Sequence, residues 1–101
     1  MIDMTLVDSI SGTSNEALLY SRIIKLWNEL EELKGFGFPH LVGSLRIEGG
    51  RIVDFDAEII LMRGLRESIV EDAGVIEFMI PIEKSAGPEA LVKKILNILG
   101  V

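Results

Sequence analysis

The chain has 101 residues, of which 49% are hydrophobic, and a formal net charge of −6. This length suits a single globular domain, and the absence of cysteine excludes disulfides, thiol catalysis and zinc–thiolate sites. The ten Lys and Arg residues are scattered along the chain, so we expect neither a nucleic acid nor an anionic membrane surface as a partner.

Glutamine is also absent, while Glu, Arg and Ile are plentiful, and this pattern indicates a thermophilic source. Residues 1–10 carry two Asp and no basic residue, so they do not resemble a signal peptide. No apolar run approaches the length of a membrane span. We therefore expect a cytoplasmic protein.

The first half of the chain begins with Ile2–Ile10, where apolar and polar residues alternate as in a half-buried strand. Thr13 or Ser14 is predicted to cap a helix over Asn15–Lys34. The apolar stripe of that helix consists of Leu19, Ile23, Leu26, Leu30 and Leu33.

The segment GFGFPH, residues 35–40, is interpreted mainly as a turn from the helix into a strand. Gly35 is predicted to end the helix in a left-handed conformation, with Phe36 packing back near Leu30. Pro39 favours an extended conformation for Phe38.

Leu41–Glu48 and Arg51–Met62 are predicted to form a β-hairpin. The apolar residues of the two strands share a face only if the loop between the strands has an odd number of residues. This parity predicts a three-residue loop, Glu48-Gly49-Gly50, with Gly50 left-handed and a bulge. On the second strand, Val53, Phe55, Ala57, Ile59 and Leu61 are expected to face the core.

The segment 63–73 is ambiguous. Leu65, Ile69 and Ala73 have helical spacing, with Gly74 as the helix end, but a short strand competes with this interpretation. Val75–Ile82 is predicted to be a strand, and Pro81 suggests an edge position. A last helix starts around Pro88 and ends at Gly100.

These elements predict a single two-layer α+β domain over residues 1–101, with helices on one face of an antiparallel sheet. If 63–73 is helical, the order is a ferredoxin-like β-α-β-β-α-β arrangement with an added C-terminal helix. If 63–73 is a strand, the order is a β-α-β-β-β-α meander.

His40 is the only histidine and could act as a general base or metal ligand. No oriented partner is visible in the sequence, so we favour a structural histidine and predict no catalytic residue, metal or cofactor. A small-ligand pocket would instead be formed by Phe36, Phe38 and His40, with Arg46 or Arg63 facing an anion.

Asp54, Asp56 and Glu58 alternate along one strand and therefore share a face. The outer two lie about 13 Å apart, too far to bind one ion, so we predict no metal site. Their face also carries apolar residues, which predicts a dimer interface with Arg46 and Arg51 paired to the acids. The predicted interface residues are Val42, Arg46, Asp54, Asp56, Glu58, Ile60, Met62 and Met79.

The sequence thus favours a small, non-enzymatic, self-associating module with a regulatory or scaffolding role. The alternative is a small-ligand-binding protein or simple enzyme with a pocket near His40. A third hypothesis is a subunit whose protein partner supplies the chemistry.

Overall fold

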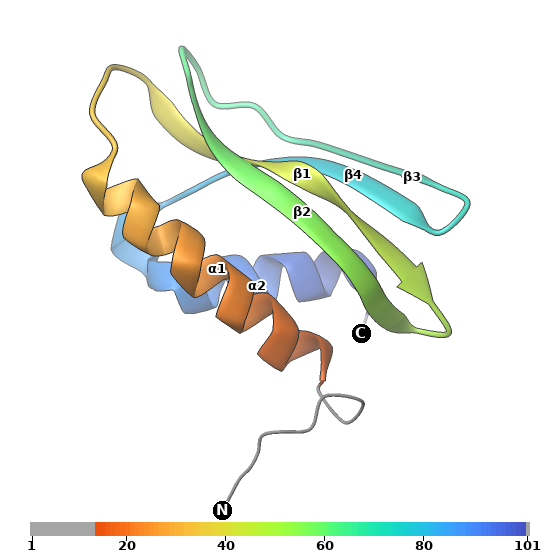
Figure 1. Ribbon diagram of the computed structural model, residues 1–101. Helices are drawn as coiled ribbons and strands as arrows, with labels where there is room; N and C mark the ends of the chain where they lie inside the picture. Colours follow the sequence, from red (N-terminus) through yellow and green to blue (C-terminus); the bar gives the residue numbers. More distant parts are fainter. Residues whose placement is uncertain (1–13, 101) are drawn as a thin grey trace, which may run out of the picture.

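Two helices cover one face of a four-stranded antiparallel sheet in residues 14–100, the part of the chain that the computed structural model describes (Figure 1). The helices are α1 (Asn15–Glu32) and α2 (Gly87–Leu99), and a short 3₁₀ helix, η3 (Lys84–Ala86), precedes α2. The strands are β1 (Phe38–Glu48), β2 (Arg51–Met62), β3 (Ser68–Asp72) and β4 (Val75–Pro81).

The strand order is β2-β1-β4-β3, so two hairpins are joined through the pairing of β1 with β4. The predicted α+β class with helices on one face is confirmed. The ferredoxin-like order is not confirmed, because residues 63–73 contain β3 and no helix. The alternative with a strand there is closer, but its β-α-β-β-β-α order gives three strands between the helices where the structure has four. In addition, β4 pairs with β1, so the sheet is not a simple meander. The predicted strand Ile2–Ile10 lies outside the described residues.

The β3–β4 turn explains why the helical interpretation of 63–73 is wrong. Ala73 and Gly74 lie at φ = 54° and 82°, and they connect Asp72 to its partner Val75. Positive φ at both central residues is the signature of a tight hairpin turn. Gly74 therefore reverses the chain between two strands and does not end a helix.

The start of α1 follows the sequence prediction, and its end does not. The Ser14 hydroxyl accepts a hydrogen bond from the Ala17 N–H at 3.1 Å and caps the helix. The helix ends at Glu32, before the predicted Lys34, and its C-cap Leu33 is extended. The left-handed end that would return Phe36 to the last turn is not formed, and Phe36 is fully exposed.

The Asn15 side chain ties the start of α1 to the edge of the sheet. Its Nδ2 donates to the Gly50 carbonyl at 3.0 Å, and its Oδ1 accepts from the Ile52 N–H at 3.0 Å. A neighbouring strand would offer the same donor and acceptor to β2. A groove of about 690 Å³ lies beside this contact, between α1 and the first residues of β2.

The β1–β2 hairpin satisfies the predicted parity by a different route. Glu48 pairs with Arg51 across a two-residue turn, Gly49-Gly50, in which both glycines have positive φ. The extra residue lies instead in β2, where the register shifts between the Arg46–Asp54 and Ile47–Ile52 pairs. This bulge turns Ile52 into the core and leaves Val53 exposed, so the predicted core position of Val53 is wrong.

The core lies between the helices and the inner face of the sheet. Leu19 and Ile23 of α1 and Ile95 of α2 are fully buried against it. Phe55 of β2 and Phe78 of β4 stack with ring centroids 6.0 Å apart. The remaining buried apolar residues are Leu30, Leu41, Leu45, Ile52, Ile76, Ile80, Ile82, Leu91 and Val92.

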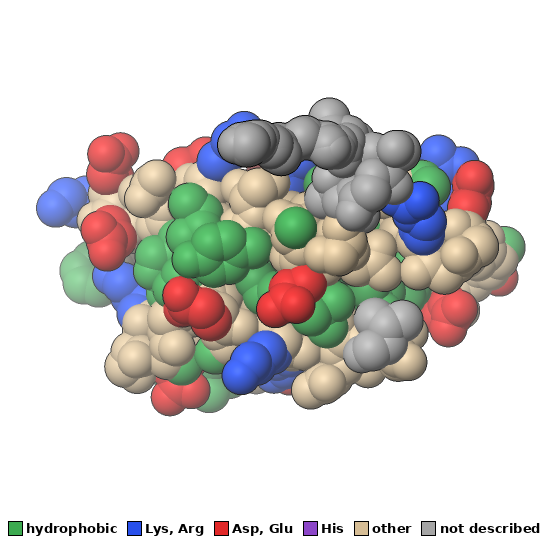
Figure 2. Space-filling view, turned by 90° about the horizontal axis from the view of Figure 1, so that it is seen from below, with side chains coloured by type: hydrophobic (Ala, Val, Ile, Leu, Met, Phe, Trp, Pro, Cys, Tyr) green, Lys and Arg blue, Asp and Glu red, His purple; other side chains and the backbone are tan. Residues whose placement is uncertain are grey.

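The last elements match their sequence signals closely. Pro88 lies in the first turn of α2, and Gly100 ends the helix at φ = 75° in the left-handed conformation. Pro81 is the last residue of β4, which is a central strand, so the predicted edge position is wrong. Pro81 is tolerated because the β3 pairing extends only to Met79. Figure 2 views the helix layer, where a hydrophobic patch is surrounded by charged side chains.

Candidate functional site

The candidate site is the sheet face opposite α1 and α2, here called the open face. Alternation from the buried core positions, together with the strand register, places its residues in rows across the strands. Val42, for example, lies between Glu58 of β2 and Met79 of β4. All the predicted interface residues share this face: Val42, Arg46, Asp54, Asp56, Glu58, Ile60, Met62 and Met79.

Apolar residues occupy the middle and one end of the open face. Val42, Ile60, Met62 and Met79 are half-buried although neither helix covers them, and the connection 63–66 borders Met62 and Met79. Between β1, β4 and β3 the face is hollowed by about 390 Å³, with Val42 and Met79 in the lining. Such a surface is more apolar than a sheet face that only contacts water.

The carboxylates gather toward the opposite end of the open face. Asp54, Asp56 and Glu58 are exposed on β2, and Glu77 lies across β1 from Asp56 on β4. Arg46 is also exposed here, and its Nη1 forms an ion pair of 2.8 Å with Glu48 on the same strand. Its charge is therefore matched within the chain. The pairing of Arg46 and Arg51 with these acids across a dimer interface stays a prediction.

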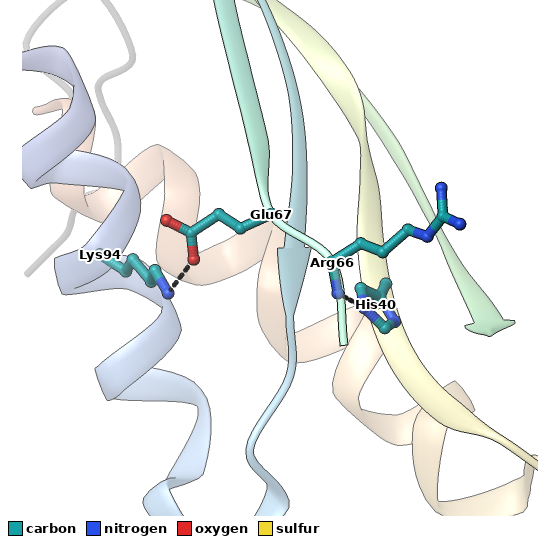
Figure 3. Close-up of polar contacts among 4 residues, drawn as sticks. All are labelled: His40, Arg66, Glu67 and Lys94. Atoms are coloured by element: carbon teal, nitrogen blue, oxygen red, sulfur yellow. Dashed lines mark hydrogen bonds and ion pairs between the residues drawn. The ribbon is translucent and has the colours of Figure 1, made fainter. Parts of the chain in front are cut away.

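His40 lies at the apolar end and is completely buried. Its Nδ1 is 2.8 Å from the Phe38 carbonyl oxygen, and its Nε2 accepts a hydrogen bond from the Arg66 backbone N–H at 2.9 Å (Figure 3). These two contacts assign the ring proton to Nδ1 and make the imidazole neutral. Both nitrogens are used inside the protein, as expected for a structural histidine.

The connection between β2 and β3 is held on two sides. His40 binds the backbone of Arg66, and the Glu67 carboxylate forms an ion pair with Lys94 of α2 at 2.8 Å. Figure 3 shows the Arg66 side chain extending away from Glu67 and α2. Arg63 and Arg66 are exposed, and within residues 14–100 neither forms an ion pair. Two unmatched cations therefore lie at the apolar end of the sheet.

The predicted ligand residues are only partly brought together. Phe36 and Phe38 are 101% and 47% exposed, and with Arg63 they line a hollow of about 530 Å³. His40 is buried and absent from that lining, and Arg46 lies toward the opposite end of β1. The hollow thus contains the two aromatic rings and the arginine that the sequence offered as the alternative to Arg46.

Two contributors to this surface could not be identified from the sequence as members of a site. Arg66 carried no motif, and the His40 bond that holds its backbone joins residues 26 positions apart. Leu65 is 68% exposed and lines a hollow of about 460 Å³ with Met62, Met79 and both arginines. Only the interpretation of 63–73 as a strand could have indicated from the sequence that Leu65 and Arg66 lie beside the sheet.

Within the described residues, no three His, Asp or Glu side chains are grouped as metal ligands would be. Neither helix in this part of the chain is both long and apolar enough to cross a membrane. No protein-family model matches the chain, and no curated protein or solved structure shows significant similarity to it. Function must therefore be argued from the geometry of the open face.

Proposed function

We propose that this chain is a non-enzymatic interaction module that self-associates through its open face, in a regulatory or scaffolding role. One observation carries the proposal. The contiguous apolar side chains of Val42, Ile60, Met62 and Met79 lie on a sheet face that neither helix covers. Burying such a surface against a second protein releases water and stabilises the complex by about 25 cal/mol per Å² of apolar area.

The layout of the open face supports this proposal. Protein interfaces combine an apolar centre with a polar rim, and they are enriched in methionine and arginine. Here the hollow near Val42 and Met79 lies centrally, with Glu77 in its lining. Arg63 and Arg66 lie farther out at one end, and Asp54 and Asp56 toward the other. A second copy is the partner we favour, because one face supplies both the cations and the acids that would match them.

The composition supports a cytoplasmic location for this module in a thermophile. The chain has no cysteine and no glutamine, two residue types that degrade with heat. Dimer formation that buries more apolar surface is one of the routes by which thermophilic proteins gain stability.

Sedimentation velocity over a concentration series tests the self-association. The wild-type chain is expected to sediment as a dimer, and Met79→Lys as a monomer, since a charged side chain would enter the apolar centre. Leu33→Lys is the matched control, because Leu33 is exposed in the helix layer, at the end of α1.

The control should retain the dimer. A wild-type chain that stays monomeric at millimolar concentration would exclude self-association. Equal loss of the dimer in both variants would place the interface elsewhere.

A second candidate function rests on the hollow lined by Phe36, Phe38 and Arg63. Two aromatic rings beside an unpaired guanidinium suit a small aromatic anion. Benzoate is expected to raise the melting temperature, and Arg63→Gln to abolish the increase. A melting temperature unchanged by benzoate would remove the support for this candidate.

A further inference from the structure

The open face is electrically asymmetric along its strands. Arg63 and Arg66 lie at the end where β2 finishes and β3 begins, and neither is matched within the described residues. Asp54 and Asp56 lie toward the other end, beyond the central row that contains Val42. From Asp54 to Met62 the strand covers about 26 Å, well over a Debye length of about 8 Å at physiological salt. The two ends therefore act as separate charged patches.

Two sheets that meet face to face with their strands aligned can be related by a two-fold axis in either of two directions. An axis parallel to the strands brings equal ends together, so cations face cations and carboxylates face carboxylates. An axis perpendicular to the strands, within the interface plane, brings opposite ends together. Both directions allow contact between the apolar centres, so the charges decide between them.

We propose that the partner on the open face is a second copy of this chain, related by the perpendicular axis. Arg63 and Arg66 of one protomer then face Asp54 and Asp56 of the partner subunit, and the reverse contact is made at the other end. Val42 and Met79 lie near the axis. This inference rests on the proposed self-association and specifies its geometry.

The environment of Arg66 supports this arrangement. Its backbone is fixed by the hydrogen bond to His40, and its side chain extends away from α2 (Figure 3). Arg46, toward the other end of this face, is already paired with Glu48, and Arg51 is not free either. The cations free to meet a second subunit thus lie at one end.

Reciprocal charge reversal tests the orientation. Arg63→Glu/Arg66→Glu should dimerise at least about tenfold more weakly than wild type in 50 mM salt, and so should Asp54→Lys/Asp56→Lys. An equimolar mixture of the two variants should restore association, because every reversed end then meets a reversed partner. Arg22→Glu/Lys25→Glu is the control, since these exposed helix residues give the same change in net charge off the open face.

Sedimentation velocity provides the readout, and unfolding midpoints close to wild type show that the variants fold. A wild-type dimer whose dissociation constant is unchanged by Arg63→Glu/Arg66→Glu would overturn the perpendicular axis and leave self-association intact. Equal weakening by the α1 control would also overturn it, because only net charge would matter. A monomeric wild-type chain would instead remove the proposed function itself.

Discussion

The Nε2 atom of His40 accepts a hydrogen bond from the Arg66 backbone N–H at 2.9 Å, so the only histidine in the chain holds the β2–β3 connection against β1. The imidazole is completely buried and the bond itself is partly buried, which limits the competition from water. The same bond fixes the backbone of Arg66, which belongs to the proposed dimer interface. A structural histidine therefore has a direct connection to the proposed function.

His40→Ala is expected to lower the free energy of unfolding by about 3 kcal/mol, because it removes a buried ring and leaves the Arg66 N–H without its acceptor. Arg66→Ala is the matched control: it keeps the backbone N–H and should change stability by less than about 0.5 kcal/mol. Urea unfolding measures both values. Similar losses in the two variants would show that the arginine side chain, and not the histidine bond, holds this segment.

Gly43→Ala is expected to destabilise the β1–β2 pair by about 3 kcal/mol. A Cβ atom at Gly43 would clash with the Asp56 carbonyl oxygen and lie 2.6 Å from the Ala57 Cα, so the strands would have to separate. Gly64→Ala is the control, because nothing lies within 4 Å of its Cβ position. Thermal unfolding should show a large loss for the first variant only. Equal melting temperatures would contradict the close approach of the two strands.

Asn15→Ala is expected to lower stability by about 1–2 kcal/mol, since it removes both hydrogen bonds to the edge of β2. Asn15→Asp keeps the acceptor for the Ile52 N–H and should lose about half as much. Asn28→Ala makes the same change at an exposed position of α1, where alanine slightly favours the helix. Denaturant titrations that rank the two Asn→Ala variants equally would exclude a role for the Asn15 contacts.

Ala73→Gly is expected to raise stability by about 0.5–1 kcal/mol. Ala73 has φ = 54° in the β3–β4 turn, where an L-residue with a side chain is strained by about 1–2 kcal/mol and glycine is not. Ala90→Gly in the exposed surface of α2 should have the opposite sign and lose up to about 1 kcal/mol. Calorimetry compares the melting temperatures of the two variants. A lower melting temperature in both would mean that Ala73 is not strained in the turn.

Periodicity alone predicted much of this architecture. The helix over Asn15–Glu32 and the strand pair before and after Gly49-Gly50 appear close to their predicted bounds. Strand alternation also placed the predicted interface residues on one face. These successes share a cause: side-chain direction in a regular element depends on residue spacing, which is visible in the sequence.

The errors occur where a choice depends on residues distant in the chain. Either a bulge at Val53 or a three-residue loop would place the apolar residues of the two strands on one face. Only the packing of Ile52 into the core decides between these two possibilities. Likewise, residues 68–72 of the ambiguous segment form a strand because Ile69 and its neighbours pair with β4. The His40–Arg66 bond was invisible for the same reason, since no local pattern links a ring to a backbone group 26 positions away.

The two hairpins of this sheet and the β1–β4 pair between them differ in the sequence distance that the chain must bridge when they form. Each hairpin closes through a two-residue turn, and such local units form within about 1–10 μs. The β1–β4 pair instead joins residues as distant in sequence as His40 and Pro81, so its formation carries the larger loss of chain entropy. Pairing of β1 with β4 should therefore set the folding rate. Mutations in this strand pair should slow refolding more than mutations in either hairpin turn.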